Sequence, residues 1–457
     1  MKNKVKIKFL GAAGTVTGSK YLIETNQKTL MIDCGMFQGL KELRERNWEP
    51  LPIDATKVDY VLLTHGHLDH VGYLPRFVKE GFSGDIIATS PTLAVAEIVL
   101  KDSAKIHEED AERAKKEGYS KHENPEPFYT LKEAEETLQY FKSTDEGEWI
   151  SLTDDIKARF MYNGHIIGAT FIELEIYGKR FVFSGDIGRS DDLLLDPPKK
   201  PEKADYLFIE TTYGNRLHPQ EKLDKYFEDA IINVMRNRGN IIIPSFAIER
   251  LQVLMYLLWK MQKEDKIPDI SIYVDSPMGN NVIQVFEHFP QWHNLPMNEF
   301  HQMLKKINIV TSYKETWETI DTKKCKIIIA GSGMVTGGRV LTYLKQLIDE
   351  PETTVILVGY QAEGTRGRQM LEGAKEIKFF GKYYPVNAKI ESIHSLSAHA
   401  DQAELLDWLS ELKSEPTNIF LVHGEPTAAD TFRVKLQDVY HWKSYRPKLY
   451  EEIEIYI

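Results

Sequence analysis

Short apolar runs that end in a histidine or an acidic residue recur along this chain of 457 residues. The residues that end these runs are Asp33, His165, Asp186, Glu210 and His423. Sheets bind ligands beyond the ends of their strands, and a strand ends where its apolar run stops. The pattern therefore predicts a fold in which several strands deliver polar side chains to one rim of a sheet.

The segment Thr64–His70 carries the strongest single signal and directly follows an apolar strand expected at residues 58–63. It contains three histidines and one aspartate, His65, His67, Asp69 and His70. In an extended loop, residues i and i+2 point to the same side, so His65 and His67 can bind one cation. Asp69 and His70, at the start of the next helix, can reach a second. This set of ligands without a thiolate suits zinc, with manganese or iron as alternatives.

A site for two cations needs a group that bridges them, because they lie about 3.5–4 Å apart. Asp186 is the natural bridge, since a carboxylate has two oxygens. His165 would complete the first site and His423 the second. We therefore predict two divalent metal ions, zinc in first place with manganese as an alternative. A water held between them would become a hydroxide nucleophile at neutral pH.

The pattern of predicted strands and helices changes after Glu210. Residues 1–209 contain short strands and turns together with a Glu- and Lys-rich helical excursion. In residues 210–383, apolar strands alternate with helices of about three turns, which predicts a parallel, doubly wound sheet. Mixed strands and helices return in residues 384–457. The expected fold class is α/β, with a smaller α/β domain inserted into a larger α/β host.

Composition excludes several classes of protein. The 57 Lys+Arg and 68 Asp+Glu residues give a net charge of −11, so any binding of nucleic acid must use a local patch. Two cysteines, Cys34 and Cys325, exclude a disulfide scaffold and a Cys-rich zinc module. The N-terminal residues lack the apolar stretch of a signal peptide, and no apolar run approaches the roughly 18 residues that span a membrane. We expect a cytoplasmic location and no membrane partner.

The pattern His65-x-His67-x-Asp69-His70, with His165 and Asp186, resembles the metal ligands of the metallo-β-lactamase superfamily. Asp33 matches the early acidic residue of that superfamily.

Three further segments resemble the extra motifs of its β-CASP branch. They are Glu210-Thr-Thr-Tyr-Gly214, Ser397-Ala-His399-Ala-Asp401 and Val422-His423-Gly424-Glu425. The branch includes the mRNA 3′-end cleavage subunit and bacterial RNA-processing nucleases.

The resemblance implies a four-layer αββα sandwich with an inserted β-CASP domain that acts as a lid over the active-site cleft. In RNA-cleaving members the third motif carries a metal-ligating histidine, here His423, which favours RNA over DNA. The second-motif histidine, His399, is expected to be the general acid, held by Glu210. An alkoxide leaving group needs such a proton. Asp33 and Asp69 complete the expected catalytic set.

The segment Lys326–Arg339 is predicted to be a strand, a glycine-rich turn and the start of a helix. Backbone N–H groups at such a junction can cradle a phosphate. The family carries a similar Ser-Gly-Met segment facing its cleft, so we expect substrate contacts from Ser332, Gly333, Met334 and Thr336. A tight turn without a ligand is the alternative.

A second local feature is the basic stretch between Gly364 and Ile390. It contains six basic and two acidic residues. It could line one wall of the cleft or be a solvated surface.

The combined hypothesis is a two-metal ribonuclease that hydrolyses phosphodiester bonds of single-stranded RNA through a metal-bridged hydroxide, in RNA processing or decay. Its rivals are a DNA nuclease, a thioester or lactone hydrolase on the same metal core, and a non-catalytic scaffold subunit. The sequence leaves open endonucleolytic or 5′-exonucleolytic cleavage. It also leaves open the oligomeric state, for which a homodimer is one option.

Overall fold

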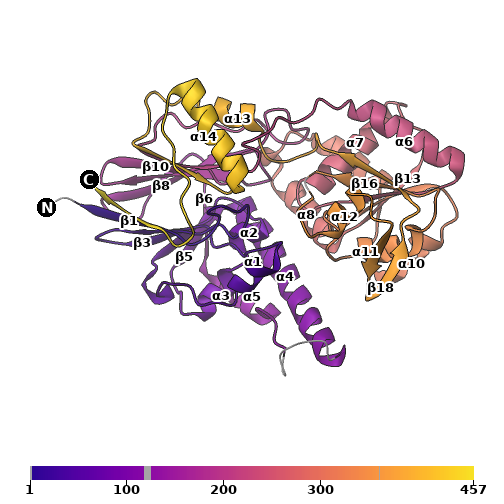
Figure 1. Ribbon diagram of the computed structural model, residues 1–457, viewed down its shortest axis with the longest axis horizontal. Helices are drawn as coiled ribbons and strands as arrows, with labels where there is room; N and C mark the ends of the chain where they lie inside the picture. The colour runs from indigo at the N-terminus through magenta and orange to yellow at the C-terminus, as the bar shows by residue number, and fades with distance from the viewer. Residues whose placement is uncertain (1–2, 118–124, 360) are drawn as a thin grey trace. The chain divides into compact units, whose positions relative to one another are not determined.

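The chain divides into two compact units in a computed structural model that describes residues 3–117, 125–359 and 361–457 (Figure 1). The first unit comprises residues Met1–Leu217 and His399–Ile457, and the second comprises His218–Ala398. The second unit is therefore an insertion in the first. It begins and ends later in the chain than the insertion expected at residues 210–383.

The first unit contains a seven-stranded sheet in the order β21-β1-β2-β3-β4-β5-β6. The alternation of lysine with Val5, Ile7 and Phe9 in β1 puts the apolar side chains in the core and the lysines outside, as a half-buried strand requires. The strands are β1 (Lys4–Phe9), β2 (Tyr21–Glu24), β3 (Thr29–Ile32), β4 (Tyr60–Leu62), β5 (Asp85–Thr89), β6 (Phe141–Thr144) and β21 (Glu452–Tyr456).

A six-stranded sheet in the order β20-β11-β10-β9-β8-β7 packs against the first sheet. Aromatic rings join the two: Phe9 lies 5.9 Å from Phe208 and 5.4 Å from Phe420, and Tyr21 lies 6.1 Å from Phe183, measured between ring centroids. The strands are β7 (Trp149–Ser151), β8 (Ile156–Tyr162), β9 (Thr170–Ile176), β10 (Lys179–Phe183), β11 (Tyr206–Glu210) and β20 (Asn418–Val422).

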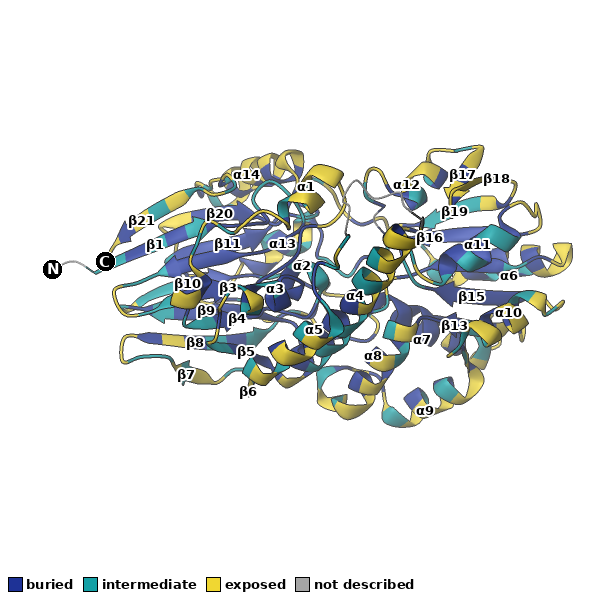
Figure 2. Cartoon of the chain, turned by 90° about the horizontal axis from the view of Figure 1, so that it is seen from below, coloured by how far each residue is buried: buried dark blue, intermediate teal, exposed yellow. Residues whose placement is uncertain are grey.

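Helices cover the outer face of each sheet and complete an αββα sandwich. Helix α4 contacts β5 and β6, and α2, α3 and α5 lie beside it over the first sheet (Figures 1 and 2). Helices α13 and α14 bury Trp408 and Phe432 against the outer face of the second sheet. The helices are α1 (Lys41–Arg46), α2 (Leu68–Val71), α3 (Leu74–Lys79), α4 (Ser90–Glu117), α5 (Leu131–Thr137), α13 (Gln402–Trp408) and α14 (Pro426–Tyr440), with 3₁₀ turns at Ala55–Lys57 and Leu138–Tyr140.

The second unit is built on a parallel sheet in the order β14-β13-β15-β12-β16-β19. The residues of β15 and β16 are all buried, as expected for a parallel sheet covered on both faces. The strands are β12 (Ile241–Pro244), β13 (Ser271–Asp275), β14 (Asn308–Ile309), β15 (Lys326–Ala330), β16 (Thr354–Val358) and β19 (Lys389–Ile393). Because β19 pairs with β16, residues that the sequence assigns to the host domain lie in the second unit.

The helices of the second unit alternate with these strands, so the predicted doubly wound domain is confirmed. They are α6 (Leu223–Asn237), α7 (Arg250–Lys263), α8 (Pro277–His288), α9 (Met297–Lys306), α10 (Tyr313–Asp321), α11 (Val340–Leu347) and α12 (Arg366–Leu371), with a 3₁₀ turn at Pro290–Trp292. A separate hairpin joins β17 (Glu376–Phe379) to β18 (Lys382–Pro385). Among the helices in the described ranges, none combines the length and apolar character needed to cross a bilayer.

The aromatic contact between the two sheets of the first unit gives a stability prediction. The ring of Phe208 is buried, with its centroid 4.1 Å from that of Phe183. Phe208→Ala should lower the free energy of unfolding of this unit by about 3–5 kcal/mol, because it removes buried apolar surface and leaves a cavity. Urea unfolding followed by tryptophan fluorescence measures the change. Phe246→Ala, at a ring that is 38% exposed, is the control, and an equal loss in both variants would contradict the prediction.

Candidate metal centre

The ligand-type side chains of the first unit follow the ends of strands that run in one direction. Strands β8, β10, β11 and β20 all point the same way, because β9 is antiparallel to both β8 and β10, and β11 is parallel to both β10 and β20. Residues that follow these strands, His165, Asp186 and His423, therefore meet at one edge of the second sheet. Strands β3 and β4, which are parallel, bring Asp33 and the histidine loop to this edge from the first sheet.

Glycines allow the ligand loops to approach so closely. A Cβ atom at Gly66, between two of the histidines, would lie 2.5 Å from Cγ1 of Val95. Gly185, directly before Asp186, has a φ of +55°, and a Cβ there would lie 2.7 Å from Cβ of Thr64. A larger residue at either position would displace the side chain next to it.

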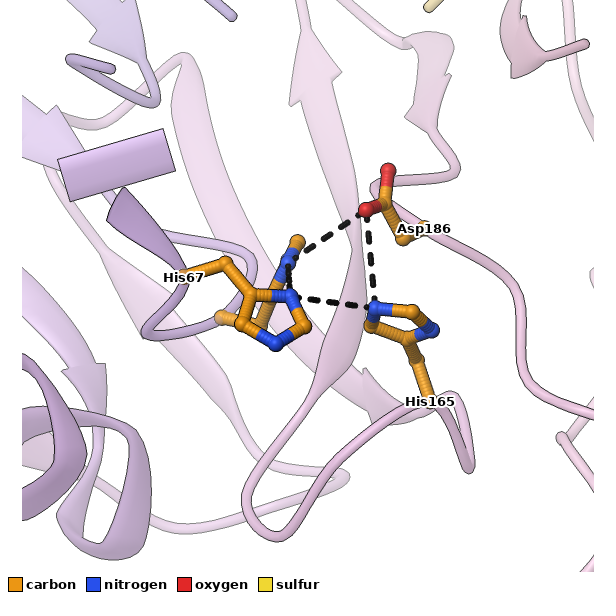
Figure 3. A group of neighbouring side chains, drawn as sticks. His67, His165 and Asp186 are labelled. Atoms are coloured by element: carbon orange, nitrogen blue, oxygen red, sulfur yellow. Dashed lines mark hydrogen bonds and ion pairs between the residues drawn. The ribbon is translucent and has the colours of Figure 1, made fainter. Parts of the chain in front are cut away.

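One group of four ligand atoms converges from His65, His67, His165 and Asp186 (Figure 3). Nδ1 of His67 lies 3.1 Å from Nε2 of His65 and 3.2 Å from Nε2 of His165. Oδ2 of Asp186 lies 3.5 Å from both of those Nε2 atoms. Zinc–nitrogen bonds of about 2.0–2.1 Å in a tetrahedron place neighbouring ligand atoms about 3.3 Å apart, which matches these spacings. Nδ1 of His67 can carry only one proton, and that proton could be donated with good geometry to only one of these two Nε2 atoms.

A second group contains Asp69, His70 and His423. Nε2 of His423 lies 3.2 Å from Nε2 of His70 and 3.4 Å from Oδ2 of Asp69. The other oxygen of Asp186, Oδ1, lies 3.4 Å from Nε2 of His70. Asp186 therefore presents one oxygen to each group. Within the described residues this buried Oδ1 accepts no hydrogen bond, as expected for an atom that binds a cation.

The protonation states of His65, His67 and Asp186 suit metal ligands. Burial lowers the pKa of His65 well below its ordinary value and lowers the pKa of His67 to about 4. Both rings are therefore neutral near pH 7 and have lone pairs available. Burial raises the pKa of Asp186, but the surrounding histidines, His423 and His70 foremost, outweigh it and hold that pKa well below the usual range. The carboxylate of Asp186 is thus ionised.

Asp33 supports the ligands from behind. Its Oδ2 lies 2.7 Å from Nδ1 of His70, and its Oδ1 accepts hydrogen bonds from the backbone N–H and the hydroxyl of Thr64. A carboxylate on the far nitrogen of a ligating histidine fixes the orientation of the ring. Asp33 is therefore placed to position His70.

His399 and Glu210 form a pair beside the bridge. Nδ1 of His399 lies 3.3 Å from Oε2 of Glu210 and 4.0 Å from Oδ2 of Asp186. Burial lowers the pKa of His399, but Glu210 and Asp186 outweigh it and raise that pKa to about 9. Glu210 is also within reach of a cation group with Asp186 and His423. Its Oε1 accepts a 2.5 Å hydrogen bond from the backbone N–H of Ile187, and its carboxylate faces His399, so it is better placed to support that ring.

Few side chains of the centre are exposed to solvent. His65, His70, His165, Asp186 and His423 are all buried. His67, Asp69 and His399 are partly exposed, with the side chain of Asp69 at 18% and that of His399 at 22%. A substrate would meet these three side chains first.

The expected substrate contacts lie in the second unit, in the turn after β15. The hydroxyl of Ser332 accepts hydrogen bonds from the backbone N–H groups of Thr336 and Gly337. The carbonyl of Gly333 accepts a hydrogen bond from the side chain of Gln361, while Met334 sits within the same turn. These contacts stabilise the turn within the second unit. The assignment of this turn to substrate binding stays a prediction.

Sequence reasoning missed Lys20, a buried lysine that braces the centre. Its Nζ donates a 2.5 Å hydrogen bond to the carbonyl of Gly35 and lies 4.6 Å from the ring centroid of Phe37. A Cβ at Gly35 would lie 1.6 Å from the carbonyl oxygen of Asp69, so this loop packs directly on the ligand segment. A lone lysine at the start of an apolar strand gives no signal of such a role in the sequence.

The fold and the site together define a metal-dependent hydrolase, and comparison with known proteins agrees. Residues 13–226 match the metallo-β-lactamase superfamily, residues 251–370 match the Beta-Casp domain, and residues 383–447 match the Zn-dependent metallo-hydrolase RNA specificity domain.

Several curated proteins are similar over most of their length. The chain is 34% identical to Ribonuclease TTHA0252 of Thermus thermophilus over 91% of this chain and 92% of that protein. It is 31% identical to an RNase J-like protein of Methanocaldococcus jannaschii over 96% of both chains. It is 28% identical to the transcription termination factor FttA of the same organism over 99% of this chain and 72% of that protein. The chain therefore belongs to the β-CASP family of the metallo-β-lactamase superfamily.

A solved structure shares the fold. It is titled as a protein of unknown function from Enterococcus faecalis, with a TM-score of 0.55 and 12% identity over 99% of this chain and 100% of that chain.

The two groups of ligand atoms predict a metal content. Wild-type protein loaded with zinc and dialysed should retain about two ions per chain, and Asp186→Asn should weaken both sites because one side chain serves both groups. Inductively coupled plasma mass spectrometry measures the content. Asp191→Asn, at an exposed aspartate, is the control. Retention of both ions by Asp186→Asn at wild-type affinity would show that Asp186 is not the bridge.

Lys20 predicts a pH dependence of stability. Burial lowers its pKa from 10.5 to about 8. Below pH 8 the lysine is protonated in both states, and its buried charge destabilises the fold. Between pH 8 and 10.5 the unfolded state binds more protons than the folded state, so the free energy of unfolding should rise by up to about 3 kcal/mol.

Lys20→Met supplies the comparison, because other lysines and tyrosines also titrate in this range. The stability of wild type relative to Lys20→Met should rise between pH 7.5 and pH 9.5 in urea unfolding. A difference between the two proteins that stays constant over this interval would contradict the buried charge.

Proposed function

We propose that this protein is a ribonuclease that hydrolyses phosphodiester bonds of single-stranded RNA with two divalent ions, zinc in first place, in RNA processing or decay. The observation that carries the proposal is the His399–Glu210 pair next to the carboxylate of Asp186, which presents its two oxygens to the two groups of ligand atoms. This arrangement combines a centre for charge stabilisation with a proton donor for a leaving group.

Divalent ions held by these residues would supply Lewis acidity and lower the pKa of a bound water. The chain itself does the rest. Asp33 fixes the ring of His70, and burial, which holds the pKa of His65 well below its ordinary value, keeps the ring of His65 neutral. Asp69 and His67 are the partly exposed ligands, so a reacting phosphate would approach them from solvent.

His399 is suited to the role of general acid. Its Nδ1 faces Glu210, and its side chain is 22% exposed, whereas His65, His70, His165 and His423 are buried. Glu210 fixes the orientation of the ring through a carboxylate that is itself completely buried and hydrogen-bonded. A histidine held in this way can donate a proton to the leaving oxygen as the P–O bond breaks.

RNA as the substrate rests on the relatives and on His423. Two of the similar proteins are named as a ribonuclease and an RNase J-like protein, and the C-terminal match is described as an RNA specificity domain. His423 completes the second ligand group, as the resemblance to RNA-cleaving members implies.

The direct test compares labelled single-stranded RNA, single-stranded DNA of the same sequence and a thioester as substrates of the zinc-loaded protein. We expect turnover of RNA, loss of turnover with a chelator, and loss in His65→Ala with His67→Ala. Sizing of products from 5′-labelled and internally labelled RNA separates internal from 5′-terminal cleavage. Preference for DNA or for the thioester would overturn the proposal.

The role of His399 makes a sharper prediction. His399→Ala should lower kcat on RNA about 10²–10⁴-fold, because an alkoxide then leaves without a proton. Cleavage of bis-p-nitrophenyl phosphate, whose leaving group needs no proton, should fall far less. His394→Ala, at an exposed histidine five positions earlier in the chain, is the control. Equal losses on both substrates would assign His399 a structural role instead.

A further inference from the structure

The hairpin of β17 and β18 in the second unit has two different faces. Ile377 and Phe379 are buried and pack with Tyr384 in the core of this unit. Lys378 and Tyr383, directly opposite each other across the hairpin, belong to the other face and are exposed. Figure 2 draws buried and exposed positions along the same short strands. The core-facing residues fold the hairpin, so its outer residues are available for another role.

Two aromatic rings of this hairpin are solvent-exposed. Tyr383 is 62% exposed and Phe380, at the tip, is 55% exposed. Phe380 and Gly381 form the two-residue turn, with φ of +46° and +81°. Such a turn favours Asn-Gly, and a bulky residue at positive φ is unfavourable. The chain thus places a phenylalanine where it hinders the turn and buries little, which points to a role outside folding.

One lysine lies near each of these rings. Nζ of Lys378 lies 5.6 Å from the ring centroid of Tyr383, and Nζ of Lys345 lies 6.0 Å from that of Phe380. Lys375 and Lys382 lie on the same hairpin or at its base. None of these four lysines forms an ion pair with any residue in the described ranges.

Other charged side chains between Gly364 and Ile390 form ion pairs. Arg368 pairs with Glu372, and Lys389 pairs with Glu391. Glu376 shares the outer face of the hairpin with Lys378, whereas Lys382 lies opposite Phe379 at the exposed end of the hairpin. In a chain with a net charge of −11, a local group of unpaired cations next to exposed rings is a distinct feature.

Arg366 ties the hairpin to the glycine-rich turn. Its guanidinium donates hydrogen bonds to the carbonyls of Lys378, Val335 and Thr336. These bonds fix the hairpin at its β17 strand. A ligand that spans the hairpin would therefore meet a β17 backbone that is held in place.

Resting on the proposed function, we propose that Phe380 and Tyr383 stack on bases of the single-stranded RNA substrate, while Lys345, Lys375, Lys378 and Lys382 bind its phosphates. We name these six residues the hairpin platform. Aromatic rings accept any base, and lysines neutralise a flexible backbone, so this chemistry fits single-stranded nucleic acid without sequence preference. A folded acidic protein would match the lysines but would leave the two rings without stacking partners.

The test uses the full chain and two lengths of RNA. Phe380→Asn suits the backbone of the turn and removes the ring, so it should fold at least as well as wild type. Combined with Tyr383→Leu, it should weaken binding of an RNA of about 30 nucleotides by about 5- to 100-fold. Cleavage of a hexanucleotide should stay unchanged. Phe380→Tyr, which keeps a ring at this position, should bind the long RNA as wild type does. Trp317→Ala, at an exposed ring on α10, is the matched control and should leave RNA binding unchanged.

The lysines have a separate readout. Lys378→Ala with Lys382→Ala should reduce the slope of log binding constant against log salt concentration by about 1.4, since each phosphate contact on a single strand contributes about 0.7. Lys323→Ala with Lys324→Ala changes the net charge equally in the same unit and should leave the slope unchanged. Both lysines of this control are exposed.

The outcomes separate this inference from the proposed function. If wild type neither binds nor cleaves RNA, the proposed function fails. If wild type cleaves RNA but the platform variants bind the long RNA as wild type does, the platform alone is refuted. Equal losses on the long and short RNA, or on the platform and control variants, would also refute it. Unchanged RNA binding with loss of a co-purifying protein would assign the hairpin to a protein partner instead.

Discussion

The carboxylate of Asp186 is the contact on which the rest of the site depends. Its two oxygens face different groups of histidines, so the loops after β4, β8, β10 and β20 are held around one side chain. Without an ion, several imidazoles packed at about 3 Å around a buried carboxylate are an unstable way to fill a protein interior, because buried polar groups need complementary partners. The sandwich is therefore organised to bind cations, and its aromatic core supplies the rigidity.

Support for this arrangement comes from buried groups that contact the ligand-type side chains or their loops. Asp33 contacts His70, Glu210 contacts His399, and Lys20 donates a hydrogen bond to the loop that packs against Asp69. Each is buried, and each is satisfied by partners from elsewhere in the chain. The partly exposed side chains of the site are those that a substrate can reach. Buried partners fix the orientation of the ligand-type side chains and so keep the site in one geometry.

Much of this could be predicted from the sequence. Apolar runs that end in His, Asp or Glu identified the strand ends, and parallel strands bring their carboxyl ends together. The i, i+2 spacing of His65 and His67 assigned these two residues to one ligand group and left Asp69 and His70 for the other. Other features depend on contacts between distant segments: the pairing of β19 with β16, the burial of Lys20 under the site, and the left-handed backbone at Phe380. No local pattern encodes these, because each depends on which segments the folded chain brings together.

The inserted unit leaves the first unit at Leu217 and returns at His399, between the two members of the His399–Glu210 pair. The backbone N–H of Gln402 donates to the carbonyl of Arg216, and its side chain donates to that of Gly214, so the outgoing and returning segments are clamped together at the site. His399 and His423 are thus among the last parts of the centre to be synthesised. During synthesis six of the seven predicted ligands precede the inserted unit, so the centre is incomplete before His399 and His423 have been added.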